Sequence, residues 1–179
     1  MKVETKPWSA VDPTTRDECA RLWERVWPSG DTPDIEARLA KLEALTPDHE
    51  SHFVHIARDA SGQIVAVART FEHQVGYQDE ERTVIALAGV CSDPDRRGDG
   101  FGDAVVREAF ERVDDLGFPA LYQTPVPDFY ERFGSRVIDN DITTSKPDAK
   151  SFDDDWAMIH PASTEWDDDV IIDLRADGW

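Results

Sequence analysis

Residues 90–102 read Val-Cys-Ser-Asp-Pro-Asp-Arg-Arg-Gly-Asp-Gly-Phe-Gly. The segment 83–92, which leads into them, is the most hydrophobic in the chain and predicts a buried strand. Apolar residues then recur at helical spacing over 101–116, which predicts a helix with one apolar face. A glycine-rich loop therefore connects a buried strand to the N-terminus of a helix.

This loop has the chemistry of an anion site. Its glycines remove the Cβ atoms that would keep a ligand away from the backbone amides. The helix behind it offers unpaired N–H groups and a partial positive charge, which suit a pyrophosphate, and Arg96 and Arg97 add two cations. The spacing is neither that of a P-loop nor that of the dinucleotide fingerprint. Taken alone, the loop is equally consistent with a simple tight turn.

The rest of the chain predicts one α+β domain over residues 1–179, with a mostly antiparallel meander followed by one strand–loop–helix–strand unit. Asp12 and Pro13 have the pattern of a helix start, and so does the pair Thr32-Pro33. A polar loop is expected over 76–82, and a short helix from Pro127 to Gly134. The expected strands are 2–11, 52–58, 63–72, 83–92, 118–124, 135–139 and 156–160.

Composition limits the function classes. Thirty-eight acidic residues against nineteen basic ones give a net charge of -19, which argues against a nucleic-acid partner. Two explanations of the acidity are open. One is a solvated acidic surface of the kind that suits a saline cell, and the other is a pocket that attracts cations. Two cysteines are too few for a disulfide framework, and no spacing suggests a metal site. No apolar run is long enough to span a membrane, and the first residues lack the apolar core of a signal peptide. We expect a cytoplasmic protein without a metal.

Two motifs carry a family resemblance. Residues 90–102 resemble the acetyl-CoA motif of the GNAT superfamily of N-acetyltransferases, R-x-x-G-x-G after a strand. Residues 129–134, Phe-Tyr-Glu-Arg-Phe-Gly, resemble its second motif, a tyrosine followed by a short helix and glycine. The order of the predicted elements fits the GNAT fold over most of the chain, a mixed and mostly antiparallel sheet flanked by helices.

The resemblance implies a site for acetyl-CoA as co-substrate where strands 83–92 and 118–124 splay apart. Tyr130 would then protonate the departing thiolate, or hold it by a hydrogen bond, unless it is a packing residue. Backbone groups at Val90, Cys91 and Ser92 would bind pantetheine and polarise the thioester. The implied contacts of the phosphates are Arg96, Arg97, Gly98, Asp99, Gly100, Phe101, Gly102 and Asp103.

The sequence departs from the family pattern at two places. Asp99 stands where the family usually has Lys or Arg, so a carboxylate faces the phosphates unless it turns to solvent. The central strand holds no carboxylate over 84–90 that could serve as general base. Glu72 and His73, at the end of the preceding strand, are the candidates, and bulk water acting on an already neutral amine is the alternative. Cys91 is interpreted as a small buried residue rather than a nucleophile.

The C-terminus resembles that of the amino-sugar-acting branch, such as aminoglycoside 2′-N-acetyltransferases. In that branch an acidic residue and a terminal tryptophan hold the cationic sugar, and Asp177 and Trp179 match them here. A tryptophan that packs the tail against the surface is the alternative. The branch's active-site glutamate is replaced by Ala88.

These features predict an enzyme that moves an acetyl group directly from acetyl-CoA to a primary amine of a small cationic acceptor, an amino sugar or a similar amine. A protein of GNAT fold that binds acyl-CoA without catalysis, as a sensor, is one alternative. An acetyltransferase acting on peptide or protein N-termini is the other. No nucleic-acid or membrane partner is expected, and the chain is expected to be a monomer or a homodimer.

Overall fold

The computed structural model describes residues 1–30, 32–45, 50–144 and 156–176, and it confirms the predicted α+β class. The helices are α1 (Pro13–Val26), α2 (Ile35–Leu45), α3 (Phe101–Leu116) and α4 (Pro127–Glu131), with 3-10 turns at Trp8–Ala10 and Pro94–Arg96. The strands are β1 (Val3–Pro7), β2 (Phe53–Arg58), β3 (Ile64–Tyr77), β4 (Glu80–Ser92), β5 (Ala120–Thr124), β6 (Arg136–Val137), β7 (Ile142–Thr143), β8 (Trp156–His160) and β9 (Ile172–Asp173).

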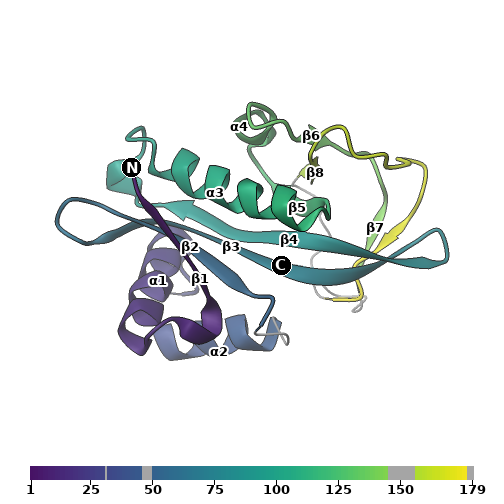
Figure 1. Ribbon diagram of the computed structural model, residues 1–179. Coiled ribbons are helices and arrows are strands. Elements are labelled where there is room, and N and C mark those ends of the chain that lie inside the picture. Colours follow the sequence, from purple (N-terminus) through teal and green to yellow (C-terminus); the bar gives the residue numbers. More distant parts are fainter. Residues whose placement is uncertain (31, 46–49, 145–155, 177–179) are drawn as a thin grey trace. The chain divides into compact units, whose positions relative to one another are not determined.

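The chain divides into two compact units, each made of two segments. Unit 1 comprises Met1–Phe71 and Ala88–Ala109, and unit 2 comprises Glu72–Leu87 and Phe110–Trp179. The elements β3, β4 and α3 contribute residues to both units. The hydrogen-bonded strand order is β1-β2-β3-β4-β5-β8-β6, and β9 joins β7 to β3 (Figure 1). The pairs are antiparallel except β4–β5 and β7–β9 among those whose register is described.

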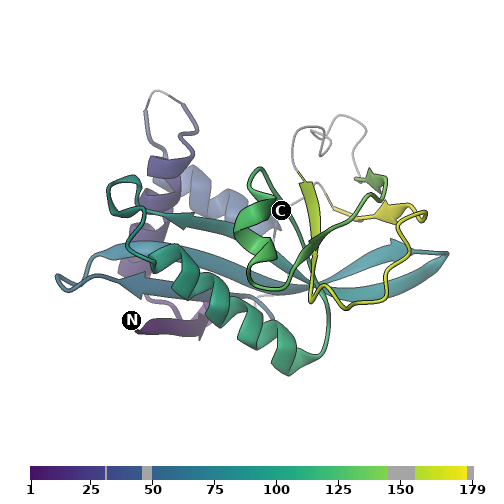
Figure 2. The ribbon, with the colours of Figure 1, turned by 90° about the horizontal axis from the view of Figure 1, so that it is seen from above.

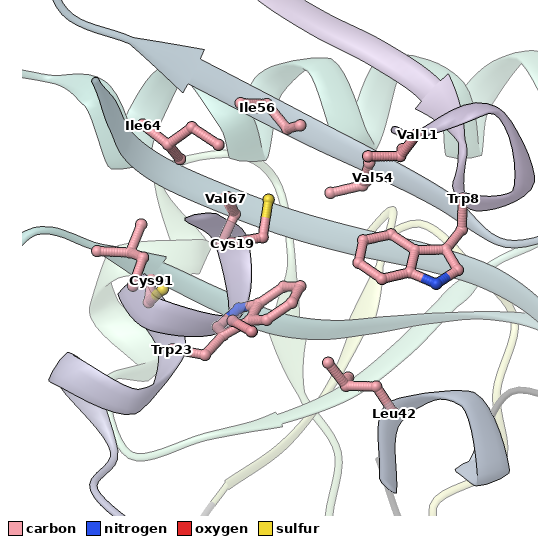
Figure 3. Close-up of a cluster of buried hydrophobic side chains, with 12 residues drawn as sticks. Trp8, Val11, Cys19, Trp23, Leu42, Val54, Ile56, Ile64, Val67 and Cys91 are labelled. Carbon is pink, nitrogen blue, oxygen red and sulfur yellow. The ribbon is translucent and has the colours of Figure 1, made fainter. Parts of the chain in front are cut away.

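Unit 1 is built around the apolar stripe of α1. The helix begins as predicted, because the Asp12 carboxylate accepts a hydrogen bond from the Thr15 backbone N–H at 3.0 Å and Pro13 occupies the first turn. The stripe packs against β2 and β3 in one buried cluster (Figure 3), whose members include Trp8, Trp23, Val54, Ile56 and Val67. The first strand ends earlier than predicted, at Pro7, because the chain turns there to bury Trp8.

The other face of the unit 1 strands carries a polar network. His55 and Thr70 hydrogen-bond across β2 and β3 at 3.0 Å, and His55 also bonds Thr5 of β1 at 3.0 Å. Thr5 in turn donates to Glu108 of α3. α1 and α2 therefore cover one face of these strands, and the first part of α3 covers the opposite face (Figure 1).

In unit 2, β3 and β4 form a tight hairpin, so the predicted polar loop over 76–82 is wrong. The strands reach Tyr77 and Glu80, and the two turn residues, Gln78 and Asp79, both adopt positive φ, 51° and 62°. Positive φ at both central residues is typical of the hairpin turn whose twist matches its strands. The polar side chains thus belong to strand ends rather than to a loop.

The remaining strands of unit 2 extend from β5. β8 pairs antiparallel with β5 from Ala120–His160 to Thr124–Trp156. β8 is the yellow-green strand in the view from above (Figure 2). β7 was not predicted, because a two-residue strand leaves no periodic pattern; it pairs in parallel with β9. A second apolar cluster, which includes Val75, Tyr77, Leu121, Ile159 and Trp166, forms the core of this unit. No helix in the described residues is long and apolar enough to cross a membrane.

Candidate active site

The glycine-rich loop of unit 1 begins at Asp93, which is held in place by hydrogen bonds. Asp93 is buried, and its carboxylate accepts hydrogen bonds from Arg25 of α1 at 2.6 Å and from the Asp95 backbone N–H at 2.9 Å. Its own backbone N–H donates to the Val65 carbonyl of β3 at 2.8 Å. The start of the loop is therefore held by both α1 and β3.

The two loop arginines differ in their partners. Arg96 forms ion pairs of 2.8 Å with Asp99 and with Asp59, and the hydrogen bond that it donates to Asp99 raises the pKa of Arg96 above its ordinary value. Asp99 is thus turned to Arg96, within the loop itself. Arg97 is exposed and has no ion pair in the described part of the chain. Arg97 is therefore the loop cation whose charge is not already matched by a carboxylate.

The loop leaves space above its backbone. Gly98 and Gly100 adopt φ of 89° and 82°, and a Cβ at either position would meet no atom within 4 Å. The first hydrogen bond of the following helix joins the Ala104 N–H to the Gly100 carbonyl at 3.1 Å. The N–H groups of Phe101 and Gly102 precede that bond, in the turn where a helix lacks acceptors of its own. Open space, helix amides and Arg97 together fit a phosphate group.

Gly89, which sequence analysis did not single out, shapes β4 just before Val90. It has a φ of 59°, and its carbonyl accepts a hydrogen bond of 2.7 Å from Trp23 Nε1 of α1. A Cβ there would lie 3.1 Å from Trp23 Nε1 and 3.3 Å from Arg69 Nε. A glycine within a strand pattern is the signal that could have indicated this irregularity.

The predicted contacts of pantetheine follow Gly89 directly. Val90 and Ser92 are half-buried, and Cys91 is buried in the unit 1 cluster. Burial raises the pKa of the Cys91 thiol, which opposes formation of a thiolate. This agrees with its interpretation as a packing residue.

Tyr130 lies in α4 of unit 2 and is buried, with 6% of its surface exposed. Its ring centre is 4.9 Å from those of Tyr122 and Phe129. The Tyr130 carbonyl accepts the hydrogen bond that closes the helix, from the Phe133 N–H at 2.9 Å. Its ring is therefore positioned by aromatic packing and its backbone by the short helix.

The two base candidates, Glu72 and His73, also belong to unit 2. Glu72 is exposed, and His73 is half-buried. His73 Nε2 lies 2.6 Å from the Leu174 carbonyl, which can only accept, so Nε2 carries the proton. A base function of neutral His73 would therefore use Nδ1. Asp177 and Trp179, the predicted acceptor contacts, lie outside the described residues.

No group of three or more potential metal ligands occurs in the described ranges.

The acid and base candidates, Tyr130, Glu72 and His73, are grouped in unit 2, and the residues predicted to bind CoA are grouped in unit 1.

Comparisons with known proteins identify the family. A family model described as an acetyltransferase (GNAT) domain matches residues 9–138, more than half of the chain. The chain belongs to the GNAT acetyltransferase family. The match ends before the C-terminal segment, so the resemblance of that segment to the 2′-N-acetyltransferase branch lies outside it. A search of curated proteins found no match.

Solved structures agree on the GNAT fold. A GNAT family N-acetyltransferase of Escherichia coli in complex with CoA has a TM-score of 0.62 at 14% identity, covering 97% of this chain and 89% of its own. An aminoglycoside 6′-N-acetyltransferase complexed with coenzyme A has a TM-score of 0.61 at 15% identity, with coverage of 93% and 100%. A GCN5-related N-acetyltransferase from Kribbella flavida has a TM-score of 0.58 at 20% identity; the match covers 76% of this chain but only 33% of that one. These identities establish the fold alone.

Proposed function

We propose that this GNAT protein is an N-acetyltransferase that moves an acetyl group from acetyl-CoA directly to a primary amine of a small acceptor. The observation that carries the proposal is the loop over 96–102, where two glycines of positive φ leave open space in front of the first turn of α3. Helix amides and the unmatched charge of Arg97 favour a phosphate in that space.

Gly100→Val tests the CoA site. The valine side chain would enter the open space and keep phosphates away from the amides, so we expect CoA affinity measured by calorimetry to fall at least about tenfold, which is about 1.4 kcal/mol. Gly117→Val is the matched control, because Gly117 also has positive φ and open space but lies at the other end of α3. Equal CoA affinity in folded Gly100→Val and Gly117→Val would contradict the assignment.

Tyr130 is the proposed proton donor to the departing thiolate. Tyr130→Phe keeps the ring contacts with Tyr122 and Phe129 and removes only the hydroxyl. General acid catalysis is worth about 10²–10⁴-fold, so we expect a loss of that order in kcat with little change in acetyl-CoA affinity. A variant that keeps full kcat would make Tyr130 a packing residue.

Glu72 and His73 remain the candidates for the base that receives the amine proton. The exposed Glu72 and the half-buried His73 are compared as Glu72→Gln and His73→Gln. If one of these residues is the base, replacing it should lower kcat/KM more at low pH than at high pH, because the amine is already neutral at high pH. If neither variant changes the pH profile of kcat/KM, bulk water is the base.

The acceptor is proposed to be cationic, an amino sugar or a similar amine, because the net charge of -19 attracts cations. Asp177 and Trp179 would supply two carboxylates to its ammonium group. Deleting residues 177–179 should then raise KM for the amine and leave KM for acetyl-CoA nearly unchanged. A lower melting temperature with both constants changed slightly would instead indicate a packing role.

A second candidate is a GNAT-fold sensor that binds acyl-CoA without catalysis. It is favoured by Ala88, which stands in β4 where the amino-sugar branch has its glutamate. Release of CoA thiol with a panel of amines distinguishes the two, because a sensor binds CoA and releases none.

A further inference from the structure

Arg69 is a charged side chain within the apolar cluster of unit 1. It lies on β3 with 4% of its surface exposed, directly opposite Val54 of β2. Side chains alternate between the faces of a strand, so Arg69 shares its face with Val67. Val54 and Val67 both belong to the cluster beneath α1 (Figure 3), so the guanidinium points to the same side.

The guanidinium forms no hydrogen bond from Nε or Nη1, and no ion pair, with the residues that the structure describes. Both of these nitrogen atoms are buried. Its carbon Cζ lies 5.5 Å from the centre of the Trp23 ring. The Gly89 carbonyl, which accepts the Trp23 N–H at 2.7 Å, forms no hydrogen bond with Arg69 Nε. The surroundings are therefore aromatic and apolar.

Burial does not remove the charge. It lowers the pKa of Arg69 to about 10, so the side chain stays protonated at neutral pH. An unpaired buried charge is strongly unfavourable, and an apolar residue of similar volume is often at least as stabilising in such a position. The cation–π contact with Trp23 offsets part of this cost, but it supplies no acceptor for Nε and Nη1, whereas an anionic ligand would.

We infer that Arg69 binds a carboxylate of the acceptor, so that the acceptor is an amine that also carries a carboxylate, as amino acids do. This inference rests on the proposed N-acetyltransferase function. It keeps the amine of the proposed acceptor and adds a carboxylate, so the acceptor is zwitterionic rather than purely cationic. A Cβ added at Gly89 would lie 3.3 Å from Arg69 Nε, and Gly89 is followed immediately by Val90 and the residues proposed to hold the thioester end of acetyl-CoA. A carboxylate on Arg69 would therefore place the acceptor beside that segment of unit 1.

The number of charges favours a carboxylate over a phosphate. Arg69 carries one positive charge and a carboxylate carries one negative charge, so the pair leaves no excess buried charge. The planar fork of a guanidinium also matches a carboxylate with two parallel hydrogen bonds. A zwitterionic amine has no net charge and is not excluded by a chain with a net charge of -19.

The test compares amino acids with their carboxamides as acceptors, since each pair shares its amine and differs in the charge. Wild type, Arg69→Met and Arg69→Lys are assayed for CoA release, and Arg21→Met is the control. Arg21 is an exposed arginine on α1, so its variant makes the same change of net charge outside the cluster. Met has a similar volume to the Arg stem, and Lys keeps the charge but loses the fork.

We expect wild type and Arg21→Met to prefer the amino acid over its amide by roughly 10- to 150-fold in kcat/KM. Arg69→Met should lose this preference, keep its CoA affinity, and melt at an equal or higher temperature; Arg69→Lys should keep part of the preference. A purely structural role predicts equal losses for both acceptors. Equal turnover of acid and amide by wild type, or a preference that survives in Arg69→Met, would overturn the inference. So would a preference for aminoalkyl phosphates over the amino acids.

A binding readout separates this inference from the proposed function. If CoA binds but no amine is acetylated, the proposed function fails, and thermal shift with amino acids and their amides still tests Arg69. Stabilisation of wild type by the amino acid alone, absent in Arg69→Met, supports the carboxylate site. The absence of any difference between acid and amide contradicts it.

Discussion

Arg69 in unit 1 and His160 in unit 2 are both buried, and the protein accommodates them in different ways. His160 stacks on Phe110 at 3.7 Å between ring centres, and its Nδ1 lies 3.3 Å from the Ser135 hydroxyl. Desolvation lowers the pKa of His160 below its ordinary value, so the ring is neutral near pH 7. Desolvation also lowers the pKa of Arg69, but only to about 10, and the guanidinium remains charged.

The difference shows which buried groups need a partner. A histidine escapes the penalty of burial by releasing its proton, and an arginine cannot do so at physiological pH. Arg96 illustrates a third solution, in which two carboxylates of the same unit match the charge. Among these three groups, only Arg69 keeps a buried charge that the described chain does not match. This is why we assign a ligand to Arg69 and not to the other two.

The largest effect is expected at Gly89, where the backbone approaches Arg69 and Trp23. Gly89→Ala adds a Cβ at 3.1 Å from Trp23 Nε1 and 3.3 Å from Arg69 Nε, in a residue with a φ of 59°. The left-handed conformation costs about 1–2 kcal/mol and misfit in a packed core about 1–3 kcal/mol. We expect the free energy of unfolding in urea to fall by roughly 2–4 kcal/mol.

Gly62→Ala is the control for this variant. Gly62 has a φ of 88° in the turn between β2 and β3, but a Cβ there would meet no atom within 4 Å. Its loss should be the conformational part alone, about 1–2 kcal/mol. If both variants lose the same free energy, the contacts of Gly89 with Trp23 and Arg69 do not constrain the backbone.

A smaller effect, on CoA affinity, is expected from changes at the two arginines of the glycine-rich loop, of which Arg96 is paired with carboxylates and Arg97 is not. Arg97→Gln removes the exposed cation, and we expect CoA to bind roughly tenfold more weakly, which is about 1.4 kcal/mol. Asp99→Asn should act in the opposite direction, since it removes a negative charge from the loop and leaves Arg96 with one paired carboxylate, Asp59, in place of two. We expect CoA to bind about threefold more tightly, an effect that salt should reduce.

Asp115→Asn controls for net charge in the same calorimetric titrations. Asp115 is exposed near the C-terminal end of α3, roughly 18 Å along the helix from Asp103, which is beyond the Debye length at physiological salt. Its variant should bind CoA as wild type does. Weaker CoA binding by Asp99→Asn would mean that Asp99 orders the loop rather than competing with the phosphates.

Local patterns in the sequence predicted most of the fold. The caps at Asp12 and Pro13, the apolar stripe of α3 and the hydrophobic run of β4 each depend on residues close in the chain, and the structure confirms these elements. The hairpin at Gln78 and Asp79 was missed, because its turn lacks the Asn-Gly or Asp-Gly pair that signals positive φ.

The site could be predicted only where a motif marks it. The glycine spacing located the loop over 96–102, and the pairing of Arg96 with Asp59 required the fold, because 37 residues separate the two. The sequence did not indicate Arg69 as a site residue, because an arginine within a strand pattern is normally an exposed polar position. Its buried N–H groups lack an acceptor because none of the side chains packed around them supplies one. These neighbours come from distant parts of the chain, so no local pattern predicts the missing acceptor.

The smallest effect is expected at His160, and its sign follows from the direction of the pKa shift. Since the pKa of His160 is lower in the folded state than in the unfolded chain, the unfolded chain binds more protons as the pH falls past about 6.5. Stability should therefore be constant above that pH and should decrease below it. The Asp114 carboxylate, 3.7 Å from Nε2, opposes this decrease, because it favours the protonated ring.

We expect the melting temperature of wild type to fall between pH 7 and pH 5 by more than that of His160→Gln, which retains a polar group near Ser135 but does not titrate. The difference between the two slopes isolates His160 from the other four histidines and from the carboxylates. It should be smaller than the effect of Gly89→Ala. Arg69→Met provides the contrast, because a group that stays charged throughout this range adds nothing to the slope. Parallel pH profiles for wild type and His160→Gln would show that His160 titrates alike in the folded and unfolded chain, and the contrast between the two buried groups would then rest on Arg69 alone.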